Sequence, residues 1–395
     1  MRKERKKEGE QESEWLIFTV YRPENCYKIN LYSSNIHFYS SYGGLSMIKF
    51  GIIGFGGMGY WHFENASKID GVQFVAAHDI NPAALEDAKR SGLKAYDTLE
   101  SFLGDTDIDA VLISASNPAH KELVIAAARA KKAIICEKPA ALSVSDFDEM
   151  VACAKENNVF LTVHQNRRWD KDYRTVKAVM ESGTLGNVFH ITSRLYGIFG
   201  YVHGWHCFKD QGGGMLFDWG VHLIDQILQL IPDKLISVWS DMKVVVNSEV
   251  DDYFKLLLRF ESGQCVEIEL GTLMLHGLPR WYVAGDKGTA IVNSFAGDGR
   301  IIRTVKEFRK LPIRIADTTS GPTRTFVPTS EEDFKYEELP EVTNNGWTEF
   351  YRNFMDVMEN GAKPAVQLDQ VRRVLRVMDA ARLSAQKKQE IAFEE

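Results

Sequence analysis

The segment GGGMLFDWGVHLID, residues 212–225, carries two carboxylates and an imidazole in an otherwise apolar stretch. Asp218 and His222 are four residues apart and share one face of a helix, and Asp225 extends this polar stripe. A histidine titrates near neutral pH and suits the removal of a hydroxyl proton, while a nearby carboxylate can orient the ring or hold a substrate. The spacing favours a helix with a proton-handling face. The alternative is an ordinary histidine on a half-buried helix.

A glycine-rich loop, GFGGMG at residues 54–59, directly follows the apolar segment 48–53. Gly54, Gly56 and Gly59 have the G-x-G-x-x-G spacing of a dinucleotide-binding turn. The first glycine permits a tight turn, the second lets a pyrophosphate approach the backbone, and the third lets helix and strand pack closely. The N-terminus of the following helix then faces the phosphates. The motif predicts a dinucleotide site.

An acidic residue, Asp79, lies at the end of the next predicted strand, about 20 residues after the loop. A carboxylate at this place can accept hydrogen bonds from the adenosine ribose hydroxyls. Residues 80–82 contain no arginine that would bind a 2′-phosphate, so the sequence favours NAD over NADP as the cofactor. The alternative is a plain strand–turn–helix connection in which Asp79 caps the helix.

Two further charged segments follow predicted strands. ICEKPAA, residues 135–141, brings Glu137 and Lys138 out of a buried strand, and HQNRRW, residues 164–169, follows the next strand. Ligands of parallel sheets bind at the carboxyl ends of the strands. Lys138 suits the polarisation of an oxygen and the alignment of a nicotinamide. A solvated charged loop and a salt-bridged junction between domains are the respective alternatives.

The elements that must position these residues follow from the hydrophobic pattern. Short, almost continuously apolar segments alternate with amphipathic stretches in the first part of the chain. Strands buried on both faces of a parallel sheet have this character, so we expect a doubly wound α/β domain. The expected strands span residues 48–53, 73–78, 109–114, 133–136 and 159–163.

The pattern changes after about residue 168. In YFKLLLRF, residues 253–260, apolar and polar side chains alternate with a period of two. Such alternation is typical of an antiparallel sheet that is covered on one side. We expect four helices in this second part, over residues 170–182, 214–230, 347–359 and 367–386. The first two would cover one face of the antiparallel sheet.

Composition excludes several classes of function. The chain has 395 residues and a net charge of −7, so we expect no nucleic-acid partner. No apolar run approaches the roughly 18 residues that span a bilayer, so we expect no membrane partner. The five cysteines are odd in number and form no C-x-x-C pair, which favours a reducing compartment and a cytoplasmic location.

The first 46 residues differ from the rest of the chain. They combine a charge run, a short apolar patch and a Ser/Tyr-rich stretch, without the longer apolar core and cleavage site of a signal peptide. We expect residues 1–46 to form a poorly ordered extension, and the folded domain to begin at Met47. A short arm used in assembly is the alternative.

Together these motifs resemble the Gfo/Idh/MocA family, the glucose–fructose oxidoreductase and inositol 2-dehydrogenase type of NAD(P)-dependent enzyme. The resemblance covers residues 47–395 and implies a Rossmann domain over 47–168, followed by a substrate-binding and oligomerisation domain over 169–395. This second domain is of the α+β class, on a large open, mostly antiparallel sheet. A homodimer or homotetramer is also implied. The matching segments are GFGGMGYWH, SNPAH, CEKPAA, HQNRRW, GGGMLFDWGVHLID and FYRNFMDVMENGAKPAVQLDQVRRVL.

The same resemblance implies the residues of the site. Lys138, Asp218 and His222 would form the catalytic trio. Arg168 would lie at the substrate, together with Asp218 and His222. The predicted cofactor-binding residues are Gly54, Phe55, Gly56, Gly57, Met58, Gly59, Asp79, Ser114, Asn117, His120, Glu137, Lys138 and Asn166.

A loop rich in aromatic and metal-binding types, YVHGWHCF at residues 201–208, admits two interpretations. His203, His206 and Cys207 are residue types that bind metals, but the sequence shows no second cluster of ligands elsewhere, so we expect no metal. Trp205 and His206 better suit a loop over the substrate pocket, with the indole face against a sugar ring.

The sequence therefore predicts an NAD(P)-dependent oxidoreductase, with NAD favoured, that acts on a secondary hydroxyl of a sugar, cyclic polyol or sugar derivative. Two alternatives stay open. One is a redox-assisted glycosidase that retains its NAD, and the other is a dinucleotide-binding sensor without turnover.

Overall fold

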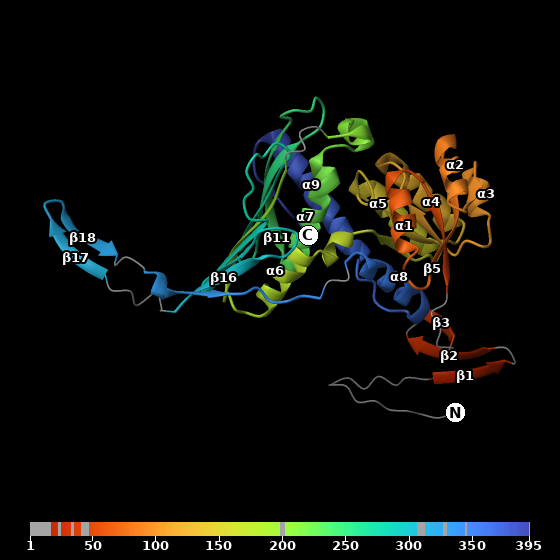
Figure 1. The fold of residues 1–395 in the computed structure, drawn as a ribbon, viewed down its shortest axis with the longest axis horizontal. Coiled ribbons are helices and arrows are strands. Elements are labelled where there is room, and N and C mark those ends of the chain that lie inside the picture. Colours follow the sequence, from red (N-terminus) through yellow and green to blue (C-terminus); the bar gives the residue numbers. More distant parts are fainter. Residues whose placement is uncertain are drawn as a thin grey trace.

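The first domain is a six-stranded parallel sheet with helices on both faces (Figure 1). Its strands have the order β6-β5-β4-β7-β8-β9, which is the 3-2-1-4-5-6 order of a Rossmann fold. The strands are β4 (Ile48–Ile53), β5 (Val72–His78), β6 (Lys94–Tyr96), β7 (Ala110–Ile113), β8 (Ala133–Cys136) and β9 (Leu161–Val163). The helices are α1 (Gly57–Ala66), α2 (Pro82–Arg90), α3 (Leu99–Leu103), α4 (His120–Arg129) and α5 (Val144–Glu156). The predicted doubly wound α/β domain is confirmed.

The strand order reverses between β4 and β7, and the crevice at such a reversal is where dinucleotides bind. Every residue of β7 and of β8 is buried, because helices cover both faces of these central strands. The carboxyl ends of β4, β5, β7 and β8 therefore converge on the loops that carry the predicted cofactor residues.

The second domain is a nine-stranded sheet in the order β19-β16-β15-β14-β10-β13-β12-β11-β20. All its pairs are antiparallel except β10 with β13, which confirms a mostly antiparallel sheet. In β12 the alternate residues Phe254, Leu256, Leu258 and Phe260 are buried, as the period of two predicts. The strands are β10 (Val188–Tyr196), β11 (Leu235–Lys243), β12 (Tyr253–Phe260), β13 (Cys265–Gly271), β14 (Trp281–Gly285), β15 (Gly288–Val292), β16 (Gly299–Thr304), β19 (Phe334–Glu337) and β20 (Ile391–Ala392).

Helices α6, α7 and α9 lie between this sheet and the first domain (Figure 1). Helix α8 follows β19 of this sheet in sequence but packs on the first domain, where Phe354 contacts Phe50 of β4. The helices of the second domain are α6 (Lys171–Glu181), α7 (Val221–Leu230), α8 (Thr348–Asn360) and α9 (Leu368–Lys387). One difference from the expected helix 214–230 is that residues Leu216–Gly220 form a π-helical turn before α7.

The computed structural model describes residues 17–22, 25–32, 35–40, 47–197, 202–305, 313–326, 330–343 and 346–394. In the N-terminal segment it has a separate three-stranded antiparallel sheet of β1 (Ile17–Arg22), β2 (Asn25–Tyr32) and β3 (Asn35–Ser40). The other residues of 1–46 lie outside the described part, and poor order of this extension stays a prediction. A hairpin of β17 (Ile313–Thr318) and β18 (Gly321–Phe326) projects from the second domain (Figure 1). In the described part of the chain, no helix is both long and apolar enough to span a membrane.

Candidate active site

The glycine loop after β4 has the geometry that a pyrophosphate requires. Gly54 has a φ of +91°, and a Cβ there would lie 2.6 Å from the backbone nitrogen of Ala115. A Cβ on Gly59 would lie 2.1 Å from the carbonyl oxygen of Gly54, because α1 packs tightly on the strand. Gly56 and Gly57 instead face open space at the N-terminus of α1. The first and third glycines are therefore needed for packing, and the second leaves room for a ligand.

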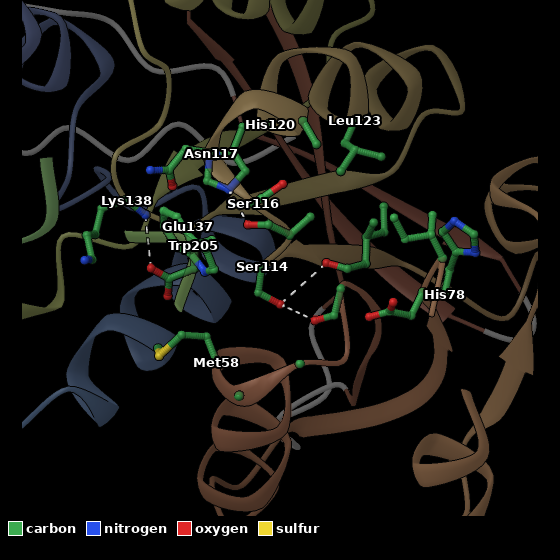
Figure 2. A pocket seen from close by; sticks show the side chains of 18 of the residues that line it. Met58, His78, Ser114, Ser116, Asn117, His120, Leu123, Glu137, Lys138 and Trp205 are labelled. Carbon is green, nitrogen blue, oxygen red and sulfur yellow. Dashed lines mark hydrogen bonds between the residues drawn. The ribbon is translucent and has the colours of Figure 1, made fainter. Parts of the chain in front are cut away.

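Asp79 holds this loop in place. Its two carboxylate oxygens accept the N–H groups of Phe55 and Asn81, each at 2.7 Å. The hydroxyl of Ser114, at the end of β7, donates to the carbonyl oxygen of Gly54 at 2.9 Å (Figure 2). The open glycine face, the helix N-terminus and an acid at the end of β5 together fit a nicotinamide adenine dinucleotide.

A single cavity of about 730 Å³ connects this loop with the predicted catalytic residues (Figure 2). Asp79 and the exposed Ile80 line one part of it, and Lys138 and Asp218 line another. Phe55 and Gly59 are buried beside the cavity rather than in its wall. The predicted cofactor residues that do line it are Gly54, Gly56, Gly57, Met58, Asp79, Ser114, Asn117, His120, Glu137 and Lys138.

Two buried side chains fix the loops on the far side of the cavity. The amide of Asn117 donates to the carbonyl oxygen of Gly212 at 3.2 Å, which joins the first domain to the segment before α7. The ring nitrogens of His120 lie 2.9 Å from the oxygen of Pro139 and 3.0 Å from that of Ala115. Burial lowers the pKa of His120, so the ring is neutral at pH 7.

The Lys138 ammonium is bound to Asp218. Its Nζ lies 2.8 Å from Oδ1 and 2.9 Å from the main-chain oxygen of Asp218. Asp218 belongs to the π-helical turn Leu216–Gly220, and such turns are frequent at functional sites. The carboxylate therefore binds Lys138 and has no hydrogen bond to the imidazole of His222. Of the two expected roles of Asp218, the structure gives no support to orienting that ring, and holding a substrate stays a prediction.

His222 is buried, with 4% of its surface exposed, and lies next to the cavity rather than in its wall. Its Nδ1 has no hydrogen-bond partner among the described residues. Burial, followed by the positive charges of Lys138 and Arg167, holds the pKa of His222 well below its ordinary value. A neutral imidazole can accept a proton, so the ring is in the state that a general base requires.

The loop with Trp205 and His206 reaches the cavity, and its contact with a substrate stays a prediction. The two rings stack with centroids 3.6 Å apart, and both line the cavity. His206 Nε2 lies 3.9 Å from Oδ1 of Asp218, so a side chain of this loop lies close to the Lys138–Asp218 pair.

In the HQNRRW segment, Arg168 forms a salt-bridged junction between distant parts of the chain. Arg168 donates to both carboxylate oxygens of Asp225, at 2.6 and 2.8 Å. It also donates to the oxygens of Ala365 and Gln370, at 2.8 and 2.7 Å. Neither Asn166 nor Arg168 lines the cavity, and the predicted ligand roles of both stay predictions. Asp225 is engaged by Arg168 and does not extend the proton-handling face.

A buried cluster around Glu137 was missed by the sequence interpretation. One carboxylate oxygen, Oε1, lies 2.7 Å from His62 Nε2 and 2.7 Å from His164 Nδ1. His62 Nδ1 in turn lies 2.7 Å from the hydroxyl of Tyr351 on α8. His62 and His164 stand inside motifs already noted, GFGGMGYWH and HQNRRW, but nothing in the sequence connects them with Tyr351.

The cavity, the glycine loop and the Lys138–Asp218 pair define a two-domain oxidoreductase that binds a nicotinamide dinucleotide. Residues 48–165 match the profile of an oxidoreductase family with an NAD-binding Rossmann fold, and residues 173–291 match the Gfo/Idh/MocA C-terminal domain. The chain belongs to the Gfo/Idh/MocA family of oxidoreductases, which confirms the resemblance and the predicted NAD(P)-dependent oxidoreductase class.

Solved and curated relatives cover almost the whole chain. An NAD-binding protein from Listeria innocua is 36% identical, with a TM-score of 0.78 over 88% of this chain and 97% of that structure. A myo-inositol 2-dehydrogenase of Thermotoga maritima is 28% identical over 88% of this chain and 99% of its own length. A scyllo-inositol 2-dehydrogenase (NADP(+)) of Bacillus subtilis is 26% identical over 88% of this chain and 96% of its own length.

Proposed function

We propose that the protein is an NAD-dependent dehydrogenase that oxidises a secondary hydroxyl of a cyclic polyol or sugar to the ketone. The observation that carries the proposal is the Lys138–Asp218 pair, which lies in the wall of the same cavity as the glycine loop. The relatives named as inositol dehydrogenases support a polyol or sugar as the substrate class.

Each side chain has a role that follows from its surroundings. When bound, the dinucleotide accepts the hydride that leaves the carbinol carbon. The Lys138 ammonium binds the hydroxyl oxygen and stabilises the negative charge that develops there, while Asp218 fixes the position of the ammonium. The neutral His222 accepts the hydroxyl proton. The stacked Trp205 and His206 rings provide a flat wall for the substrate ring.

We propose NAD rather than NADP as the cofactor because the part of the cavity expected to hold the adenosine has a carboxylate and no neighbouring positive charge at Ile80. The Asp79 carboxylate is fixed by two backbone N–H groups, and the next residue, Ile80, is 95% exposed and carries no charge. A fixed negative charge at this place accepts the ribose hydroxyls and repels a 2′-phosphate.

The test is the absorbance of reduced nicotinamide when purified protein is mixed with NAD or NADP and inositols, aldoses, glycosides or sugar acids. We expect reduction of NAD with one substrate class, and its loss in the His222→Ala variant. His190→Ala is the matched control, because His190 lies on β10, where its Nε2 is 3.0 Å from the hydroxyl of Thr192. Glycoside cleavage without net NADH would indicate the redox-assisted glycosidase, and tight NAD binding without turnover would indicate the sensor.

A further inference from the structure

Two adjacent acids, Asp251 and Asp252, end the loop that joins β11 to β12. The sequence interpretation did not single out either of them. Their carboxylates accept backbone N–H groups from two different segments, one of which leads into α7. Each acid therefore attaches a loop to the end of the sheet.

Asp251 is bonded to the first residues of the turn that carries Asp218. Its Oδ2 accepts the N–H of Leu216 at 2.8 Å, and its main-chain oxygen accepts the N–H of Met215 at 2.9 Å. Leu216 is the first residue of the π-helical turn, in which Asp218 is the third. The first N–H groups of a helix have no partner within the helix, and Asp251 satisfies two of them. The start of the turn is thus attached to the sheet through Asp251.

Gly214 brings the same carboxylate close to the main chain of the turn. It has a φ of +99°, and a Cβ at this position would overlap Oδ1 of Asp251. The carbonyl oxygen of Gly214 accepts the N–H of Asp218 at 3.0 Å, and its own N–H donates to the oxygen of His206 at 3.0 Å. Because Gly214 contacts Asp251 and is bonded to the backbone of Asp218, a shift of Asp251 would move Asp218 through a single residue.

Asp252 is occupied by a different loop. Its carboxylate accepts the N–H groups of Val245, Val246 and Asn247 and the side-chain amide of Asn247, at 2.7 to 2.9 Å. Asn247 Oδ1 in turn accepts the N–H of Val202, close to the stacked rings in sequence, at 3.1 Å. Asp252 is therefore engaged away from the turn, and it does not compensate for a loss of Asp251.

The turn determines where the Lys138 ammonium lies. Nζ of Lys138 is 2.8 Å from Oδ1 of Asp218 and 2.9 Å from its main-chain oxygen. One of these two acceptors belongs to the backbone of the turn, so a shift of the turn changes both distances even when the carboxylate is intact. Contacts through the backbone of the turn therefore connect Asp251 with Lys138.

We propose that Asp251 is a positioning residue of the active site, which holds the turn Leu216–Gly220 where Asp218 fixes the Lys138 ammonium. The inference rests on the proposed function, in which this ammonium stabilises the developing alkoxide. Asp251 acts through the turn, and no step of the reaction requires it to touch the substrate or the dinucleotide. Its loss should therefore lower kcat and leave the binding of NAD unchanged.

The turn uses the acceptor oxygen of Asp251 rather than its charge. Burial raises the pKa of Asp251 to about 6, with the charge of Asp252 acting in the same direction and the bonded N–H of Leu216 against it. A buried charge is costly, and the neutral oxygen of an amide accepts the same N–H without this cost. Asp251→Asn should therefore keep the turn in place, whereas Asp251→Ala removes the acceptor.

The first test is steady-state kinetics of the full-length variants with a substrate that the wild type oxidises. Asp251→Ala should lower kcat roughly 10- to 100-fold, and Asp251→Asn should stay within about threefold of wild type. Asp333→Ala is the matched control. Asp333 is also a buried carboxylate that accepts a backbone N–H, from Ser330 at 2.9 Å, but it precedes β19 at the far edge of the sheet. Equal losses of kcat in Asp251→Ala and Asp333→Ala would overturn the proposal.

A double variant separates positioning from a general loss of packing. In an Asp218→Asn background the contact with Lys138 is already weakened, so Asp251→Ala should lower kcat further by less than about threefold. Two residues that act through the same contact are not additive, whereas independent effects on kcat multiply. A loss as large in this background as in the wild type would show that Asp251 does not act through Asp218.

Hydrogen exchange followed by mass spectrometry tests the attachment of the turn without substrate. The backbone amides of residues 214–220 should exchange faster in Asp251→Ala than in the wild type, with no change in Asp251→Asn or Asp333→Ala. Unchanged exchange of these amides in Asp251→Ala would overturn the proposal. If exchange responds as expected but the wild type oxidises no polyol or sugar, the proposed function fails while the attachment of the turn to Asp251 stands.

Thermal unfolding and NAD titration verify that each variant is folded. Asp251→Leu fills the space of the carboxylate without an acceptor, and it takes the place of Asp251→Ala if that variant does not fold. The same loss of kcat and the same faster exchange are expected of it. Wild-type kcat in a folded Asp251→Leu would overturn the proposal.

Discussion

Lys138 is bonded to both the side chain and the main chain of Asp218, at 2.8 and 2.9 Å from Nζ. One residue follows β8 of the first domain and the other lies in the π-helical turn before α7 of the second domain. The pair therefore joins the two domains in the wall of the cavity. Because the ammonium makes two bonds to one residue, its position depends on the turn as well as on the carboxylate.

Lys138→Met should lower kcat by about 10²- to 10³-fold, because it removes the positive charge that faces the developing alkoxide. NAD affinity should change little, since the glycine loop and Asp79 do not contact the ammonium. The measurements are steady-state kinetics and a fluorescence titration with NAD. Lys121→Met is the control, because Lys121 pairs with Asp146 and Glu149 at 2.8 Å outside the cavity. Equal losses in both variants would contradict the assignment of Lys138.

The two glycines of the cofactor loop should respond differently to the same substitution. Gly54→Ala should destabilise the fold by at least about 2 kcal/mol, because a Cβ at φ +91° would lie 2.6 Å from Ala115 N. Gly56→Ala should leave the unfolding midpoint nearly unchanged, because the φ of Gly56 is −81° and a Cβ there would have no atom within 4 Å beyond its chain neighbours. Its methyl group would instead occupy the ligand side and weaken NAD binding at least roughly tenfold.

Thermal unfolding and NAD titration of both variants provide the check. Gly263→Ala serves as the control, since Gly263 has a φ of +87° with open space around it and lies between β12 and β13. It should lose about 1 kcal/mol from strain alone and bind NAD normally. Undiminished NAD affinity in Gly56→Ala would place the pyrophosphate elsewhere.

Motifs whose structural role is determined by residues close in the chain were predictable from the sequence. The G-x-G-x-x-G spacing, an acid at the end of the next strand and the alternation in β12 each depend on neighbours close in the chain. The hydrogen-bond partners of Arg168 and Asp218 were not predictable from the local pattern, because these partners come from distant segments. Arg168 binds Asp225 and residues near α9, and Asp218 binds Lys138, 80 positions away. The π-helical turn has no composition signal of its own.

The cofactor preference should follow the charge at the end of β5. Asp79→Ser combined with Ile80→Arg removes the carboxylate and adds a cation beside the ribose, so NADP should gain roughly 10- to 100-fold relative to NAD. Ile80 is 95% exposed, so the arginine can be placed without disturbing the fold. The ratio of kcat/KM for the two cofactors measures the change. Ile80→Arg alone is the control, and an unchanged ratio in the double variant would show that Asp79 does not face the ribose.

The free energy of unfolding should fall as the pH is lowered from about 7 to 5. Burial lowers the pKa values of His62, His120 and His222 below 6.5, so these rings stay neutral in the folded protein while the unfolded chain takes up protons. Each contributes up to about 1.4 kcal/mol per pH unit. The pKa of Glu137 is lowered from 4.5, so its stabilisation is lost only below that pH. Urea unfolding at several pH values tests this, and a flat profile between pH 7 and 5 would contradict the neutral rings.

Arg168 should contribute to stability rather than to ligand binding. The facing side chains of Arg168 and Asp225 are 8% and 2% exposed, so removal of one partner leaves a buried charge uncompensated. Arg168→Met should therefore cost about 3–5 kcal/mol of unfolding free energy, and Arg168→Met with Asp225→Leu should recover part of it. Below the unfolding transition, KM for NAD and for the substrate should stay within about twofold of wild type, because Arg168 does not line the cavity. A large rise of the substrate KM with an unchanged unfolding midpoint would show instead that Arg168 contributes to substrate binding.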